Sequence, residues 1–245
     1  MPYEMKTPPV QSLRVPTGWK IRKDLFVELE PDAEPKFKSV DHDDGWLLFD
    51  FELLICDYIK GNAKWILEMG WIRQFDPSGR FKLSLVKGDY SISDPLTIYE
   101  TRSLTEITKA INDTMLRISR ENNDFSTETA DLKLQELRPY NGWTFVKNEF
   151  FELDPEGDMQ VKGLPNNDGW QLLKPEMLLL EAGNYQIRVG WSPAHDSSGH
   201  FQITAISRDH GNSPLVDFLS RNKKEIVEVV EDLMKNIDKL KPNHQ

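Results

Sequence analysis

Two short stretches rich in histidine and aspartate come nearest to a reactive centre in this sequence. The stretch AHDSSGH contains His195, Asp196 and His200, which are residue types that bind zinc. Zinc sites need three or four ligands at typical spacings, and no further cluster of cysteine or histidine completes such a set. We therefore interpret these residues as polar positions of a loop and predict no metal site.

A second stretch, DHDDG, contains Asp41, Asp43 and Asp44. Carboxylates are the ligands that calcium prefers, but the remaining ligand positions of a calcium loop are absent. An Asp-Gly pair followed by an apolar run is typical of a turn that leads into a strand. The sequence therefore predicts a turn here.

The signatures of nucleophilic catalysis and nucleotide binding are missing from the chain. It contains no G-x-S-x-G elbow, no Walker loop and no G-x-G-x-x-G fingerprint. Its 40 acidic residues make any particular pair of carboxylates uninformative. We predict a non-catalytic protein without a cofactor.

The net charge of −10 favours some partners over others. There is no basic stripe of the kind that binds nucleic acid, and an anionic membrane would repel the chain. A basic protein would be attracted to it. The start of the chain lacks the apolar segment of a secretory signal, and a single cysteine, Cys56, fits a reducing compartment. We predict a cytoplasmic protein.

Two stretches of thirteen residues indicate how these residues are positioned. MGWIRQFDPSGRF occupies residues 69–81, and VGWSPAHDSSGHF occupies residues 189–201. Six of the seven tryptophans fall into three matched pairs. A period of about 120 residues is too long for a solenoid and suits a small domain. We infer from the sequence that a domain is duplicated.

Each predicted copy contains strands followed by a helix. KWILEMGW and FKLSLV alternate apolar and polar residues as strands do, and the Asp, Pro, Ser and Gly between them indicate a hairpin loop. Ser103 with Glu106 and Asn222 with Glu225 are typical of helix starts. The predicted fold class is α+β, a tandem duplication of a two-layer domain in which an antiparallel sheet of four to five strands is followed by one C-terminal helix per copy.

The predicted domain organisation follows from these elements. Residues 1–15 form a flexible N-terminal arm, residues 16–119 the first repeat, residues 120–138 a linker and residues 139–241 the second repeat. The expected assembly is a monomer with internal pseudo-symmetry.

Paired aromatic and basic residues are the remaining candidates for a site. Trp71 and Trp191 end their strands beside the hairpin loop, where they either anchor a partner or, by default, pack in the core. Arg102 and Arg221 precede the helices. They form either an anion clamp or, as we favour, a salt bridge to an acidic residue of the same copy, Glu52 or Glu176.

The sequence thus predicts a non-catalytic, acidic protein-binding module. Its most concrete form is a bacterial immunity or antitoxin-type inhibitor that covers a basic toxin or nuclease domain. The alternatives are a structural or regulatory scaffold, and an enzyme or small-ligand binder with a site between the two copies. The residues expected at a partner interface are Asp41, Asp43, Asp44, Asp76, Asp196, Trp71 and Trp191.

Overall fold

The alternating apolar segments form the strands of one antiparallel sheet. The computed structural model describes residues 8–31, 44–60, 63–88, 95–122, 132–210 and 214–237. Its strands are β1 (Trp19–Asp24), β2 (Leu54–Lys60), β3 (Ala63–Ile72), β4 (Arg80–Lys87), β5 (Thr97–Thr101), β6 (Thr144–Asn148), β7 (Leu178–Ala182), β8 (Tyr185–Ser192), β9 (His200–Ser207) and β10 (Pro214–Ser220). The two α-helices are α1 (Leu104–Glu121) and α2 (Lys223–Asn236), and the short 3-10 helices are η2 (Asp44–Leu48), η3 (Pro165–Asn167), η4 (Gly169–Leu172) and η5 (Arg208–His210).

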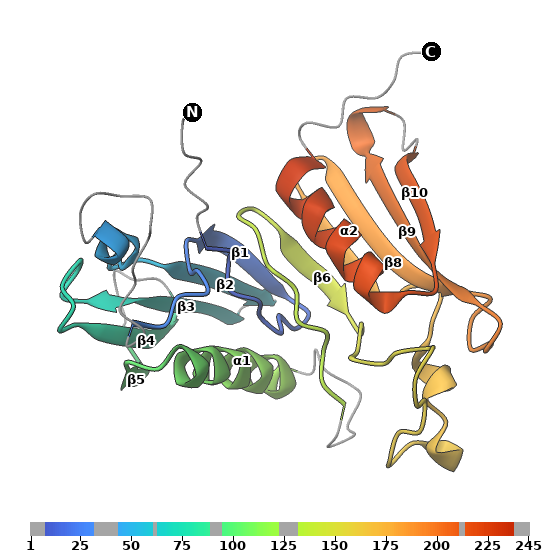
Figure 1. Cartoon of the computed structure of the whole chain (residues 1–245), viewed down its shortest axis with the longest axis horizontal. Helices are drawn as coiled ribbons and strands as arrows, with labels where there is room; N and C mark the ends of the chain where they lie inside the picture. Colours follow the sequence, from blue (N-terminus) through green and yellow to red (C-terminus); the bar gives the residue numbers. More distant parts are fainter. Residues whose placement is uncertain are drawn as a thin grey trace.

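The strand order is β10-β9-β8-β7-β6-β1-β2-β3-β4-β5, in a single ten-stranded sheet within the described residues (Figure 1). The two halves of the sheet, β1–β5 and β6–β10, meet where β1 pairs with β6 and Lys20 lies opposite Thr144. The Ile21 amide donates to the Trp143 carbonyl at 2.9 Å, and the Gly18 amide donates to the Phe145 carbonyl at 2.7 Å. The sheet therefore continues across the junction.

This continuity corrects the predicted fold class. The α+β content and the antiparallel sheet are present, but the predicted tandem of two separate two-layer domains, each with its own sheet and helix, is wrong: one sheet of ten strands carries two helices. The reason is that periodicity shows which residues form a strand but not which strand lies beside it. The edge amides and carbonyls of β1 and β6 satisfy each other instead of facing solvent.

Both helices cover the same face of this sheet. The Trp19 indole Nε1, on β1, donates to the Met115 carbonyl of α1 at 3.3 Å. The Trp143 indole Nε1, beside β6, donates to the Met234 carbonyl of α2 at 2.9 Å. Because Lys20 and Thr144 lie opposite each other, the neighbouring Trp19 and Trp143 share the other face.

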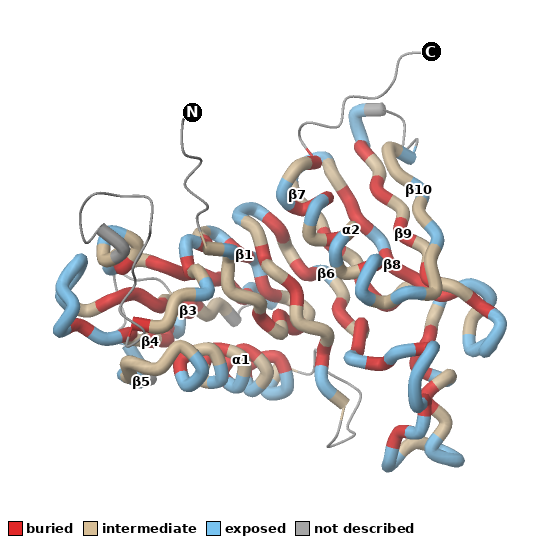
Figure 2. The backbone as a smooth tube through the Cα atoms, viewed as in Figure 1, coloured by how far each residue is buried: buried red, intermediate tan, exposed pale blue. Residues whose placement is uncertain are grey.

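The predicted helix starts are confirmed. The Ser103 hydroxyl accepts a hydrogen bond from the Glu106 amide at 3.3 Å, and the Asn222 side chain accepts from the Lys224 amide at 2.9 Å. Each helix turns an apolar stripe toward the sheet, and Figure 2 shows the buried positions of α1 on that side. Burial of these stripes holds the helices against β4 and β5 and against β9 and β10.

Residues 8–15 differ from the flexible arm that the sequence suggests. The Gln11 amide donates to the Phe26 carbonyl at 2.7 Å, and Leu13 exchanges main-chain hydrogen bonds with Leu137. Leu13 and Val15 are fully buried. Leu13 and Val15 are therefore part of the packed core.

Asp24, at the end of β1, is a buried carboxyl group with an incomplete set of hydrogen bonds. One oxygen accepts from the Phe26 amide at 3.0 Å, and the other has no partner among the described residues. Burial raises the pKa of Asp24 to about 8, which the Phe26 hydrogen bond only partly offsets. Asn148, at the end of β6, accepts from the Phe150 amide at 3.0 Å and also donates from Nδ2 to the Val15 carbonyl at 2.8 Å. The Asn148 side chain therefore both accepts and donates a hydrogen bond at the end of its strand.

Asp24→Asn is expected to remove a pH dependence of stability. The folded-state pKa of about 8 lies above the unfolded value of about 3.9, so the free energy of unfolding of the native chain falls as pH rises from about 4 to about 8. The fall approaches about 1.4 kcal/mol per pH unit and stops above the folded pKa. Urea unfolding followed by tryptophan fluorescence at several pH values measures it.

The control is Asp154→Asn, which replaces an exposed carboxylate and leaves that pH dependence in place. If the stability of Asp24→Asn falls with pH as steeply as that of the native chain, the raised pKa of Asp24 is not the cause of the pH dependence.

Candidate functional site

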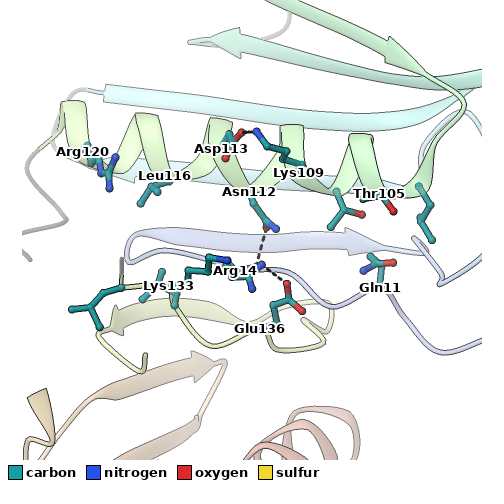
Figure 3. A pocket seen from close by; sticks show the side chains of 14 residues that line it. Gln11, Arg14, Thr105, Lys109, Asn112, Asp113, Leu116, Arg120, Lys133 and Glu136 are labelled. Carbon is teal, nitrogen blue, oxygen red and sulfur yellow. Dashed lines mark hydrogen bonds and ion pairs between the residues drawn. The ribbon is translucent and has the colours of Figure 1, made fainter. Parts of the chain in front are cut away.

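A groove of about 630 Å³ runs along α1. One wall is a stripe of residues three and four apart on the helix, from Leu104 to Arg120. At 1.5 Å per residue this stripe is about 24 Å long. The other wall comes from two extended segments outside the sheet, Gln11 to Arg14 and Leu132 to Glu136, as Figure 3 shows.

The amphipathic pattern of α1 explains why its stripe faces the groove. The buried residues Ile107, Ile111, Met115 and Ile118 turn one side of the helix to the sheet. The groove residues lie on the flank of that buried side, where Leu104 and Leu116 are half-buried and Lys109 and Asp113 are exposed. The groove is therefore apolar in its depth and charged at its rim.

Main-chain hydrogen bonds fix the opposite wall. The Leu13 amide donates to the Leu137 carbonyl at 2.9 Å, and the Leu137 amide donates back to the Leu13 carbonyl at 3.0 Å. Leu13 and Leu134 in these segments, and Leu137 next to the second one, are buried. The wall is thus formed before any ligand arrives.

Arg14 ties this wall to the helix. Its amide donates to the Asn112 Oδ1 of α1 at 2.9 Å, and its guanidinium group donates to Glu136 (Figure 3). The guanidinium group also donates to Glu152 at 2.8 Å. The Arg14 Nε is buried and has no hydrogen-bond partner among the described residues. Arg14 therefore joins three segments that are far apart in the sequence.

Arg138 makes a related contact with α2, but with different chemistry. The Glu231 carboxylate accepts from the Arg138 amide at 2.9 Å and from its guanidinium group at 3.0 Å. Glu28 accepts from the other terminal nitrogen of that group at 3.0 Å, and the buried Nε has no hydrogen-bond partner among the described residues. Burial disfavours the charged guanidinium, but hydrogen bonds to Glu231 and Glu28 outweigh it and raise the pKa of Arg138. At α2 a carboxylate faces the arginine, whereas at α1 the neutral Asn112 does.

The side chains that line the groove carry more positive than negative charge. Asp113 and Glu136 are acidic, whereas the four basic residues are Arg14, Lys109, Arg120 and Lys133. Lys109 pairs with Asp113 at 2.6 Å, which raises the pKa of Lys109. The Thr108 hydroxyl is buried and has no hydrogen-bond partner among the described residues. By residue type the lining thus contains more basic than acidic side chains, and Glu152, outside the lining, also pairs with Arg14.

Trp71 and Trp191, proposed from the sequence as interface residues, lie in the core. Each is about 1% exposed, and each indole Nε1 donates to a carbonyl of the following hairpin, Asp76 at 3.0 Å and Asp196 at 2.9 Å. The core-packing interpretation matches this placement. The indoles close their own hairpins and present no exposed ring to a partner.

Asp76 and Asp196, proposed with them, are exposed at the hairpin tips. Their carboxylates accept from the amides of Ser78 at 2.7 Å and Ser198 at 2.8 Å, which lowers both pKa values. Such turns fix the loop conformation. Neither aspartate lines the groove, and their role in an interface stays a prediction.

Arg102 and Arg221 do not make the salt bridges that the sequence suggested. Each guanidinium carbon lies 5.6 Å from the centroid of a tryptophan ring, Trp71 or Trp191. Arg102 donates to the carbonyls of Pro77 and Gly79, and Arg221 donates to those of Ser197 and Gly199.

The acidic residues expected as their partners bind other cations. Glu52 pairs with Lys23 at 3.1 Å, and Glu176 lies 4.0 Å from both Lys147 and Arg188. Arg102 and Arg221 therefore connect the hairpins to the helix starts by donating to main-chain carbonyls. A pattern of charged residues in the sequence cannot show hydrogen bonds to main-chain carbonyls.

The remaining predicted residues lie elsewhere. Asp41 and Asp43 are outside the described residues, and Asp44 begins η2. His195 has a left-handed backbone in the second hairpin, and His200 begins β9. No group of three or more His, Cys, Asp or Glu that could hold a metal occurs in the described part of the chain. None of its helices is long and apolar enough to cross a membrane.

Arg221→Met is expected to lower the free energy of unfolding by about 1–3 kcal/mol, because two carbonyls and the face of Trp191 lose a cationic donor. Arg102→Met is expected to act in the same direction. Urea unfolding measures both. Arg208→Met, which removes an exposed pair with Glu181, is the control and changes stability by less than about 0.5 kcal/mol. If all three variants are as stable as the native chain, the contacts of Arg102 and Arg221 with the hairpin carbonyls and the tryptophan rings do not contribute to stability.

Comparison of the chain with family models, curated proteins and solved structures gives no match in any of the three, so a functional proposal has to rest on the geometry of the groove itself.

Proposed function

We propose that the protein is a non-catalytic protein-binding module that receives an extended segment of its partner in the groove along α1. The observation that carries this proposal is the shape of the groove: a stripe about 24 Å long, with exposed charged residues along its rim. A chain in extended conformation advances about 3.3 Å per residue, so about seven residues fit along it.

The construction of the walls supports binding with little rearrangement. The hydrogen bonds between Leu13 and Leu137 and the contact of Arg14 with Asn112 hold both walls in place. Because the walls do not have to become ordered when a partner binds, little affinity is lost to that cost. Leu104, Leu116 and Leu132 supply apolar surface, and Gln11 supplies an amide.

The lining residues favour binding over catalysis. A hydroxyl nucleophile needs an adjacent base that is itself oriented, and neither histidine nor cysteine is among the residues described along the groove. The two carboxylates there already bind cations, Glu136 with Arg14 and Asp113 with Lys109. This arrangement supports contact with a polypeptide.

A second candidate is the narrower one, an immunity or antitoxin-type inhibitor that covers a basic toxin or nuclease domain. The net charge of −10 supports it, as do the exposed acidic residues of one loop, Glu152, Asp154, Glu156 and Asp158. In this case the acidic exterior would meet the basic domain, and the groove would not be the main contact.

Photo-crosslinking at the groove tests the first proposal. A photoreactive amino acid placed at the exposed Thr105 or at Lys133, on opposite walls, is expected to attach to the same protein, and to one continuous segment of it. The same group at the exposed Leu219 of β10 is the control and is expected not to attach to that segment. Mass spectrometry identifies the attachment sites.

Two results contradict the first proposal. Attachment to unrelated proteins from each position would show that no single partner occupies the groove. Absence of a protein adduct together with a thermal shift caused by a small metabolite would favour the alternative of a small-ligand binder.

Salt dependence tests the second candidate. The affinity for a basic partner domain is expected to fall as salt rises, because the screening length shrinks from about 10 Å at 0.1 M to about 3 Å at 1 M. The double variant Asp154→Asn, Asp158→Asn is expected to weaken binding further, whereas Lys133→Gln in the groove leaves it unchanged. Binding that is insensitive to salt and to these acidic residues would argue against a basic partner.

A further inference from the structure

A second cavity, of about 390 Å³, lies where the end of β1 meets the segment that leads into β6. Its lining comes from both halves of the chain and includes Asp24 and Leu25 at the end of β1, Leu47 of η2, Tyr140 before β6 and Lys235 of α2. The volume is in the range of small-molecule sites. We infer that this cavity binds an organic cation, a ligand that carries an ammonium group on an apolar body, and that Asp24 pairs with the ammonium group. The cavity shares no lining residue with the groove along α1, so the two sites are independent.

The apolar part of the lining is suited to the body of such a ligand. Leu25 is 48% exposed and Leu47 is 59% exposed, so both lie at the opening of the cavity. The Leu25 amide donates to the carbonyl of the buried Leu53 at 2.7 Å, and Val10 forms an isolated β-bridge with Val27. Main-chain contacts thus fix the walls, and an apolar ligand that covers the two exposed leucines removes their surface from water.

Asp24 is the polar residue of the lining that lacks a full set of partners. It is 7% exposed, and one oxygen of its carboxyl group accepts a hydrogen bond from the Phe26 amide. The other oxygen has no partner among the described residues. A buried group in this state is costly, and an ammonium group offers it both donors and an opposite charge. Asp24 therefore favours a cation over a neutral or anionic ligand of the same shape.

Tyr140 places a second acceptor near Asp24. The Asp24 amide donates to the Oδ1 of Asn141, the neighbour of Tyr140, which brings the two segments together. Burial raises the pKa of Tyr140, and the charges of Glu231 and Asp24 raise it further. Its hydroxyl group therefore stays neutral near pH 8. It can accept a hydrogen bond from an ammonium group, and the aromatic ring can contact the cation.

The charges around the cavity do not oppose a cation. Asp50, after η2, and Lys235, of α2, line the cavity and have opposite signs. Of the charges that act on the tyrosine, those of Glu231 and Asp232 are negative and that of Arg138 is positive. Arg138 is itself paired with two carboxylates. Acidic groups thus outnumber basic ones here even before Asp24 is counted, and a ligand cation meets no excess of positive charge.

Binding of three ligands of one size to the full chain tests the inference at pH 8. The probe is hexylamine, and 1-hexanol and hexanoate are its matched neutral and anionic controls. The methyl signals of a leucine-labelled chain, followed by NMR during each titration, measure the dissociation constants and show whether Leu25 and Leu47 respond. We expect hexylamine to bind about tenfold more tightly than 1-hexanol, and hexanoate to bind more weakly than either.

The protonation of Asp24 gives the binding of the amine a pH dependence. With a pKa of about 8, Asp24 is largely neutral at pH 7 and has to lose its proton before it pairs with an ammonium group. The affinity for hexylamine is therefore expected to be about fivefold weaker at pH 7 than at pH 8, whereas the affinity for 1-hexanol is unchanged. Cys56 on β2 and Tyr140 also lie near Asp24, but burial raises the pKa of both, so neither loses its proton in this interval.

Variants of the chain link this binding to the cavity. Asp24→Asn is expected to remove both the preference for hexylamine over 1-hexanol and its pH dependence, because Asn fills the same volume without a charge. Its affinity for 1-hexanol is expected to equal that of the native chain. Leu47→Ser is expected to weaken binding of both ligands about threefold, and Leu219→Ser, at an exposed leucine of β10 outside the cavity, to change neither.

Three results overturn the inference. Equal affinity for hexylamine and 1-hexanol, or a preference for hexylamine that survives in Asp24→Asn, shows that Asp24 does not bind the ammonium group. Tighter binding of hexanoate assigns the cavity to an anion. Absence of saturable binding, or binding that leaves the signals of Leu25 and Leu47 unchanged, shows that the cavity holds no such ligand. Crosslinking at the groove is independent of all these results, so the proposed function stands or fails separately.

Discussion

The main-chain pairing at the centre of the molecule is the constraint on which the rest depends. β1 and β6 share hydrogen bonds, and Leu13 and Leu137 exchange a further pair on the helix side. These contacts join residues more than a hundred positions apart, and they make one sheet of what would otherwise be two halves with exposed edges. The groove depends on them directly, because its second wall consists of residues on either side of the pair formed by Leu13 and Leu137.

Local structure could be read from the sequence, but the neighbours of each element could not. The alternation in KWILEMGW and FKLSLV predicts strands, and β3 and β4 contain them with a hairpin between. The N-caps Ser103 and Asn222 are where the pattern places them. The predicted separation into two sheets was wrong because the pairing of β1 with β6 leaves no periodic signal in either strand.

The groove was missed for a related reason. Its second wall lies in segments that the sequence suggests as an arm and a linker, and the bond from Arg14 to Asn112 spans 98 positions. A signal was present: Leu13 and Val15, and likewise Leu132 and Leu134, alternate with polar residues in stretches too short to resemble an element. Apolar residues in a supposed linker have to be buried somewhere, and Leu134 and Leu137 are buried. The net charge of the whole chain also does not show that four basic side chains line this groove.

At two pairs of positions, similar main-chain hydrogen bonds are accepted by different side chains. At the ends of β1 and β6, Asp24 and Asn148 accept the same kind of amide hydrogen bond, but only the amide of Asn148 has a donor for the nearby carbonyl. At α1 and α2, Asn112 and Glu231 accept the amide of an arginine, but only Glu231 also neutralises the guanidinium group. In the first pair the carboxylate is the poorly matched group, and stability becomes sensitive to pH. In the second pair Asn112 carries no charge, and the Arg14 guanidinium group is paired with Glu136 and Glu152 instead. Of the two pairs, only the first leaves a buried carboxyl oxygen without a partner among the described residues, that of Asp24 on β1, and the groove lies along α1 beside the same half of the sheet.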